Sequence, residues 1–152
     1  MEKQFWRERW QNRELGWHLP FVNPVLKRNL PALNPAAGAR VFVPLCGKTL
    51  DIRWLLEQGF TVVGAELSER AVRELFEELG FEPEVTSWDG GHCWHHGDLT
   101  VFQGDLFALT AAEPGPVDLV YDRAALVALP EELRARYAPH VATLTGNAPQ
   151  LL

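Results

Sequence analysis

The sequence lacks an excess of basic residues, and this weighs against a nucleic-acid partner. Its 152 residues include 14 Lys and Arg against 20 Asp and Glu, which gives a formal net charge of −6. Binding to a phosphate backbone depends on clustered cationic side chains, and no basic stripe offsets the acidic balance here. We therefore expect a partner other than nucleic acid.

Long hydrophobic runs and cysteines are also scarce. No apolar run approaches the roughly 18 residues that a membrane span requires. The N-terminal residues MEKQFWRERW contain no apolar core of the kind found in secretory signals. Two cysteines, Cys46 and Cys93, are too few for a disulfide framework and are typical of reduced thiols. These absences predict a cytoplasmic protein with no membrane partner, which we expect to be a monomer.

What the sequence does contain is a strand–turn–helix–strand unit between residues 40 and 66. Apolar residues 41–43 predict a buried strand, residues 44–47 a tight turn, residues 49–58 a helix and residues 61–65 a second strand that ends at Glu66. Parallel strands place their carboxyl ends together, so the turn and Glu66 should line one crevice. A carboxylate about 20 residues beyond such a turn can accept both hydroxyls of a ribose.

The rest of the chain continues this alternation. Ser68 is positioned to cap a helix that runs to Leu79, and Gly80 should end it. Residues 99–103 and 117–121 predict strands, residues 81–97 are rich in turn formers, and a further helix should start at Pro130. Residues 150–152 read like the first residues of another strand. The pattern predicts an α/β fold, a mostly parallel sheet with helices on both faces.

The turn itself narrows the choice of ligand. A dinucleotide fingerprint needs three spaced glycines, and only Gly47 is present, which disfavours a nicotinamide-dependent reductase. A phosphate-binding P-loop would need glycine at position 42, where the chain has Phe42. S-adenosylmethionine suits the unit, because its ribose can meet Glu66 while its adenine meets apolar walls. The simpler alternative is that Glu66 is an ordinary solvated acid after a strand.

Two further strand ends should face the same crevice. Asp105 could accept from an adenine amine while Leu106 packs the ring, although a turn-forming Asp is an equal alternative. Arg123 could hold a carboxylate or lie near a developing thiolate. A single Arg at such a position is more often part of a surface ion pair.

Residues 92–96, His-Cys-Trp-His-His, have the side chains of a metal site but not its spacing. No second Cys or His pair follows, and the flanking Gly90, Gly91 and Gly97 indicate the tip of a hairpin. We therefore predict no metal. Cys46 has no evident base beside it in sequence, and we interpret it as turn packing.

The N-terminal residues are rich in tryptophan. Trp6 and Trp10 are four residues apart in a predicted helix over residues 1–15, so they share a face. They either dock this helix on the core or provide an aromatic cover for a planar or cationic ligand. Trp17 and His18 fall in a predicted loop, where His18 could face an acceptor or simply lie at the surface.

Five motifs, spread over nearly the whole chain, resemble those of the bacterial thiopurine S-methyltransferase family. They are Phe5-Trp6-x-x-x-Trp10 with Gly16-Trp17-His18, Arg40-Val41-Phe42-Val43-Pro44-Leu45-Cys46-Gly47-Lys48, Val62-Val63-Gly64-Ala65-Glu66-Leu67-Ser68, Gly104-Asp105-Leu106-Phe107 and Tyr121-Asp122-Arg123-Ala124-Ala125-Leu126.

The resemblance implies a class I, Rossmann-like methyltransferase fold that uses S-adenosylmethionine and releases S-adenosylhomocysteine. The acceptor would be the sulfur of an aromatic or heterocyclic thiol such as a thiopurine, with selenium or tellurium species as alternatives. The implied cofactor-binding residues are Trp10, Leu45, Glu66, Asp105, Leu106 and Arg123. Arg123 would also be the catalytic residue, and Trp17 with His18 would contact the acceptor.

The resemblance also implies how the chain is divided. Residues 1–152 would form one domain, with residues 1–35 as an N-terminal helical lid and residues 40–152 as the donor-binding core. Family members continue with further strands, so we expect the C-terminal strands to be missing here. The alternative function is therefore a shortened module that binds S-adenosylmethionine without transferring its methyl group.

Overall fold

The computed structural model describes residues 26–27, 30–33, 35, 37–44, 46, 50–122, 131–146 and 148–151. Within these residues, seven strands form one sheet in the order β3-β4-β5-β2-β1-β6-β7. The strands are β1 (Arg40–Pro44), β2 (Thr61–Glu66), β3 (Glu84–Trp88), β4 (Gly91–His96), β5 (Leu99–Gly104), β6 (Leu119–Tyr121) and β7 (Gln150–Leu151). The helices are α3 (Leu50–Glu57), α4 (Glu69–Leu79) and α6 (Glu131–Thr145), with short 3-10 helices η1 (Leu30–Leu33) and η2 (Leu106–Ala108).

The central strands are parallel, as predicted. β1 pairs with β2 on one side and with β6 on the other, β2 pairs with β5, and β6 pairs with β7, all in parallel. The register places Pro44 opposite Ala65, and Glu66 opposite Gln103. Residues 150–151 form the short strand β7, in the segment where a strand was predicted.

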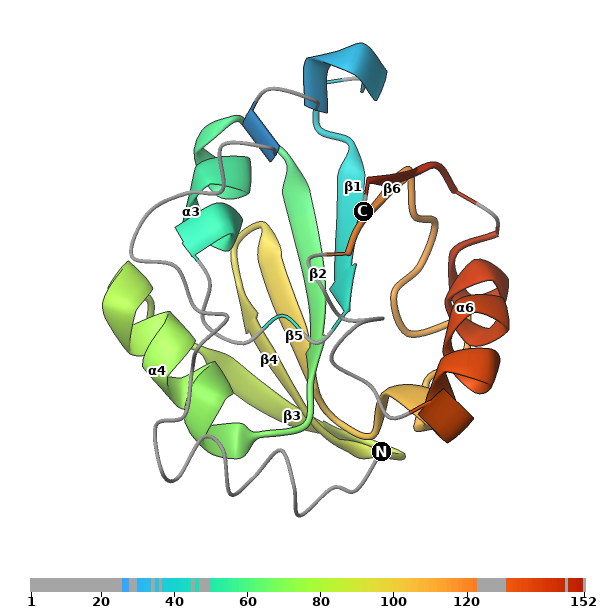
Figure 1. The fold of residues 1–152 in the computed structure, drawn as a ribbon. Helices are drawn as coiled ribbons and strands as arrows, with labels where there is room; N and C mark the ends of the chain where they lie inside the picture. Colours follow the sequence, from blue (N-terminus) through green and yellow to red (C-terminus); the bar gives the residue numbers. More distant parts are fainter. Residues whose placement is uncertain are drawn as a thin grey trace.

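Helices cover both faces of the sheet. Figure 1 shows α3 and α4 on one side and α6 on the other. Each face has its own apolar cluster: Ile52 and Leu55 of α3 and Val72 of α4 belong to the cluster on one face. Tyr137 and Val141 of α6 pack on the opposite face. The predicted arrangement of helices on both faces of a mostly parallel sheet is therefore confirmed.

Helix α4 begins and ends where its sequence predicts. The Ser68 hydroxyl accepts a hydrogen bond from the Ala71 amide at 3.2 Å, which caps the first turn. Gly80 takes the left-handed conformation, with φ of 74°, and ends the last turn. Helix α3 spans Leu50–Glu57, and so lies within the predicted range.

The prediction for residues 81–97 was wrong. These residues form the antiparallel strands β3 and β4, and β4 in turn pairs antiparallel with β5. Residues 92–96 are therefore part of a strand, while Gly90 and Gly97 lie in the turns before and after it. The strand pattern was hidden because residues 84–87 of β3 are exposed, so no alternation of apolar and polar side chains marks this strand.

Candidate functional site

The sheet reverses its strand order beside β1. The chain passes from β1 to β2 and β5 on one side, and then returns to β6 and β7 on the other side. In open α/β sheets, ligands bind outside the carboxyl ends of the strands at such a reversal. The carboxyl ends of β1, β2, β5 and β6 therefore define the edge at which a ligand is expected to bind.

Buried carboxylates mark this edge. Among the residues that the structure describes, the charged side chains that are buried are Asp51, Glu66 and Asp122, with 1%, 6% and 4% of their surface exposed. Asp51 is the second residue of α3, which follows the β1 turn, while Glu66 ends β2 and Asp122 directly follows β6. Burying a carboxylate is costly unless hydrogen bonds compensate, so the partners of these three groups matter.

Glu66 is held by the start of α4. Its Oε2 atom accepts a hydrogen bond from the Ser68 amide at 2.8 Å. This bond fixes the orientation of the carboxylate at the end of β2. Glu66 is therefore a fixed, buried acceptor, and the alternative of a solvated acid is wrong.

Gln103 is a further polar residue at this edge, and our sequence analysis missed it. Its side-chain amide donates to the Leu67 carbonyl oxygen at 3.0 Å and so ties β5 to the segment that follows Glu66. The signal in the sequence was a glutamine at the end of an otherwise apolar strand. Its partner lies 36 residues away, which no local pattern could have shown.

Asp105 and Leu106 form the turn after β5. Asp105 Oδ1 accepts from the Phe107 amide at 3.0 Å and caps η2, as the turn-forming alternative predicted. Leu106 is buried with α6, and its carbonyl oxygen accepts from Nε2 of His140 at 2.8 Å. The turn is thus fixed by both its own cap and α6.

The end of β6 is anchored to both layers of helices. The Tyr121 hydroxyl donates to Asp51 of α3 at 2.7 Å, and the Tyr137 hydroxyl of α6 donates to Asp122 at 2.7 Å. Burial, the Asp122 charge and this hydrogen bond all raise the pKa of Tyr137, so its hydroxyl stays protonated. Sequence analysis missed these pairs because their members lie 70 and 15 residues apart.

Cys46 lies beside Glu66 but is not activated. Burial raises the pKa of its thiol well above the ordinary value, and the Glu66 charge raises it further. A protonated thiol is a poor nucleophile. The interpretation of Cys46 as a packing residue is confirmed by its place in the cluster under α3 and α4.

Other predicted site residues lie outside the described part of the chain. These are Trp10, Trp17, His18, Leu45 and Arg123. Within the described part, no group of three or more His, Cys, Asp or Glu side chains is arranged to hold a metal ion. His95 instead hydrogen-bonds Thr100 at 2.8 Å, and the His96 ring stacks on Phe81 at 4.4 Å. None of the helices described is long and apolar enough to cross a membrane.

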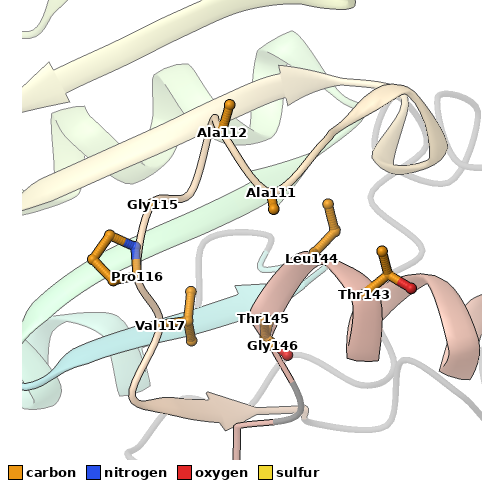
Figure 2. A pocket seen from close by; sticks show the side chains of 9 residues that line it. All are labelled: Ala111, Ala112, Gly115, Pro116, Val117, Thr143, Leu144, Thr145 and Gly146. Atoms are coloured by element: carbon orange, nitrogen blue, oxygen red, sulfur yellow. The ribbon is translucent and has the colours of Figure 1, made fainter.

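A cavity of about 440 Å³ lies elsewhere in the molecule, between the loop before β6 and the end of α6. Figure 2 shows its lining, which is mostly small side chains such as Ala111, Ala112 and Pro116. The hydroxyls of Thr143 and Thr145 bond to carbonyls of their own helix. Val117 and Gly146 precede β6 and β7, so the cavity lies at the amino ends of these strands, away from the buried carboxylates.

Comparison with solved structures supports the fold. The chain is similar to 1,6-didemethyltoxoflavin-N1-methyltransferase of Burkholderia thailandensis, solved with S-adenosylhomocysteine, with a TM-score of 0.66 and 16% identity. This match covers 94% of the present chain and 56% of the other. A TehB-like SAM-dependent methyltransferase of Corynebacterium glutamicum gives a TM-score of 0.58 at 18% identity, over 96% and 68% of the two chains. The fold is that of class I methyltransferases.

Sequence comparison is more specific. The chain is 58% identical to the thiopurine S-methyltransferase of Xanthobacter autotrophicus and 47% identical to that of Gluconobacter oxydans. These matches cover 100% and 97% of the chain, and 72% and 67% of the two relatives. For the Pseudomonas aeruginosa enzyme the identity is 48%, over 93% of the chain and 65% of the relative. The chain thus spans about two thirds of these relatives' length. The family model of thiopurine S-methyltransferase matches residues 1–152, and on this evidence the chain belongs to the thiopurine S-methyltransferase family.

Proposed function

We propose that the chain binds S-adenosylmethionine at the carboxyl edge of β1, β2, β5 and β6 and methylates the sulfur of an aromatic or heterocyclic thiol such as a thiopurine. The observation that carries the proposal is Glu66, a carboxylate that is buried at the end of β2 and oriented by the Ser68 amide. Buried acceptors suit a ligand that brings hydroxyl donors and positive charge. The names of the relatives support the thiol acceptor.

Glu66 and the turn after β5 are the described parts of the proposed donor site. Glu66 is oriented by the Ser68 amide at 2.8 Å and is proposed to accept the ribose hydroxyls. Asp105 and Leu106 are proposed to contact the adenine from the turn after β5. Trp10, Leu45 and Arg123 complete the proposed cofactor-binding set, as the family resemblance implies, and Trp17 with His18 would contact the acceptor.

The chain would contribute to the reaction mainly by aligning the acceptor sulfur with the methyl group of the donor. When bound, S-adenosylmethionine supplies the activated methyl group. Heteroaryl thiols ionise readily, so a strong general base is not required, and Arg123 is proposed to favour the ionised acceptor. Holding the reacting atoms in line can lower the activation barrier by about 7–11 kcal/mol. Residues 1–35 are proposed to cover the site and exclude water, and the chain is proposed to act as a cytoplasmic monomer.

Transfer of a radiolabelled methyl group to a thiopurine tests the proposal, with S-adenosylhomocysteine binding measured on the same sample. We expect both binding and labelled product. Binding without labelled product would support the alternative of a module that binds the donor but does not transfer. Absence of binding by a folded sample would contradict the proposed site itself.

A further inference from the structure

The backbone conformation at Gly64 of β2 is one that any residue could adopt, so it does not explain why this residue is glycine. Gly64 lies in the middle of the strand and is not among the glycines with positive φ. The reason for glycine is space, because a Cβ atom built at this position would lie 2.9 Å from the Cys46 sulfur and 3.4 Å from Cys46 Cβ. Real Cβ atoms essentially never come within 3.0 Å of another heavy atom, so a larger residue at position 64 would displace the Cys46 sulfur.

Cys46 has little room to yield. Cys46 is 5% exposed and belongs to the same apolar cluster as Ile52 and Leu55 of α3 and Val72 of α4. Its backbone amide donates to the Ala65 carbonyl at 3.0 Å, which continues the contact between the β1 segment and β2 beyond Pro44. Both the side chain and the backbone of Cys46 are therefore fixed against β2.

This contact lies directly beside the proposed ribose acceptor. Side chains alternate along a strand, so positions 64 and 66 face the same side of the sheet. Cys46 occupies the space that Gly64 leaves, and it lies near enough to Glu66 to interact with its charge. Cys46 also directly follows Leu45, the turn residue that is proposed to contact the donor.

We propose that Gly64 and Cys46 are positioning residues for the donor site: the cysteine sulfur fits against the bare Cα of Gly64 and thereby sets the distance between the β1 turn and the Glu66 carboxylate. This inference rests on the proposed function, since it concerns how that site is held in shape. Its physical basis is that well-packed sites resist added volume and shift their neighbours instead.

The test compares S-adenosylhomocysteine affinity by calorimetry in four chains: wild type, Gly64→Ala, Cys46→Ala and the double variant. We expect Gly64→Ala to weaken binding by about tenfold or more in the natural chain. In the Cys46→Ala background, the same change should alter affinity by less than about threefold, because the sulfur that it would meet is gone. Ala39→Val is the matched control, since it adds volume to the same apolar cluster at the amino end of β1.

A urea unfolding curve for each variant separates loss of positioning from loss of stability. A purely structural role would lower the stability of Gly64→Ala and Ala39→Val alike and leave the affinity of the folded protein unchanged, and this would overturn the inference. If Gly64→Ala does not fold, the double variant decides: folding and binding support the inference, and failure of either overturns it. Failure of the wild type to bind would instead overturn the proposed function, and this inference with it.

Discussion

At the scale of single residues, the central feature is the set of carboxylates buried at one edge of the sheet. Asp51 and Asp122 each accept a tyrosine hydroxyl at 2.7 Å, and Glu66 accepts the Ser68 amide at 2.8 Å. Hydrogen bonds to charged groups are stronger than those between neutral groups and fix the acceptor in place. These bonds hold the three carboxylates in place at the sheet edge.

The Tyr137–Asp122 pair should contribute measurably to stability. We expect Tyr137→Phe to lower the free energy of unfolding by about 1–3 kcal/mol, because a buried charged acceptor loses a donor. Urea denaturation measures this loss. In an Asp122→Asn background, Tyr137→Phe should lower the free energy of unfolding by clearly less. An equal loss in both backgrounds would show that the hydroxyl stabilises the protein through something other than this bond.

Cys46 predicts a pH dependence of stability. Burial holds the folded-state pKa of its thiol above that of the unfolded chain. The unfolded chain therefore loses this proton first, so stability is fully present below about pH 8.5 and falls as the pH rises, with a slope of up to about 1.4 kcal/mol per pH unit. Cys46→Ala should flatten the decline in unfolding free energy between pH 8 and 9.5. An unchanged slope would show that the thiol titrates normally.

The sequence predicted part of the site and could not predict the remainder. Glu66 was found because its position relative to the turn follows from the strand–helix–strand unit. Asp51 and Gln103 were missed because their roles depend on partners 70 and 36 residues away. A sequence pattern reports local geometry, whereas the pairing of Asp51 with Tyr121 exists only once β1 and β6 lie side by side.

At the scale of elements, the β3–β4 hairpin packs against the end of β5. The Trp88 indole donates to the Gln103 carbonyl at 3.2 Å and packs edge-on against Phe102 with ring centres 5.7 Å apart. Gly104, the last residue of β5, lies opposite Gly91. The hairpin turn therefore reaches the strand end that leads into Asp105.

This close approach requires glycine at position 104. Its φ is 150°, and an added Cβ would lie 2.2 Å from the backbone oxygen of Gly90. We expect Gly104→Ala to lower the free energy of unfolding by about 3 kcal/mol or more, because the backbone at Gly90 cannot move aside without breaking strand pairing. Urea denaturation provides the measurement.

Gly97→Ala is the matched control, because Gly97 also has positive φ, at 57°, but has open space around it. Gly97→Ala should lower the free energy of unfolding by only about 1–2 kcal/mol, which is the cost of placing alanine in the left-handed conformation. Equal losses at positions 97 and 104 would contradict the crowding argument.

The hairpin is also the element that sequence patterns missed. Helices α3 and α4 carry periodic apolar residues and, for α4, caps at both ends, so their limits were predictable. Strand β3 is exposed along residues 84–87. Strand β4 contains three polar residues, His92, His95 and His96, two of which are adjacent. Neither strand has the apolar alternation on which strand prediction depends, and pairing with β5 decides their conformation instead.

At the scale of the whole molecule, the strand order explains why distant motifs converge. The reversal beside β1 brings the ends of β2, β5 and β6 to one edge, so residues 51, 66, 105 and 122 share it. The mostly parallel sheet was predictable from the alternation of elements. Its antiparallel edge was not, and neither was the packing of α6 against η2 through His140 and Leu106.

The most direct test of the account is calorimetric titration of S-adenosylhomocysteine into the wild type and into Glu66→Gln. The substitution keeps the shape of the side chain and removes its charge. We predict that affinity falls by about 10- to 100-fold, the equivalent of losing charged hydrogen bonds to the ribose. Glu57→Gln, at an exposed position on α3, should bind like the wild type. Unchanged affinity in a folded Glu66→Gln variant would contradict the claim that this carboxylate holds the donor.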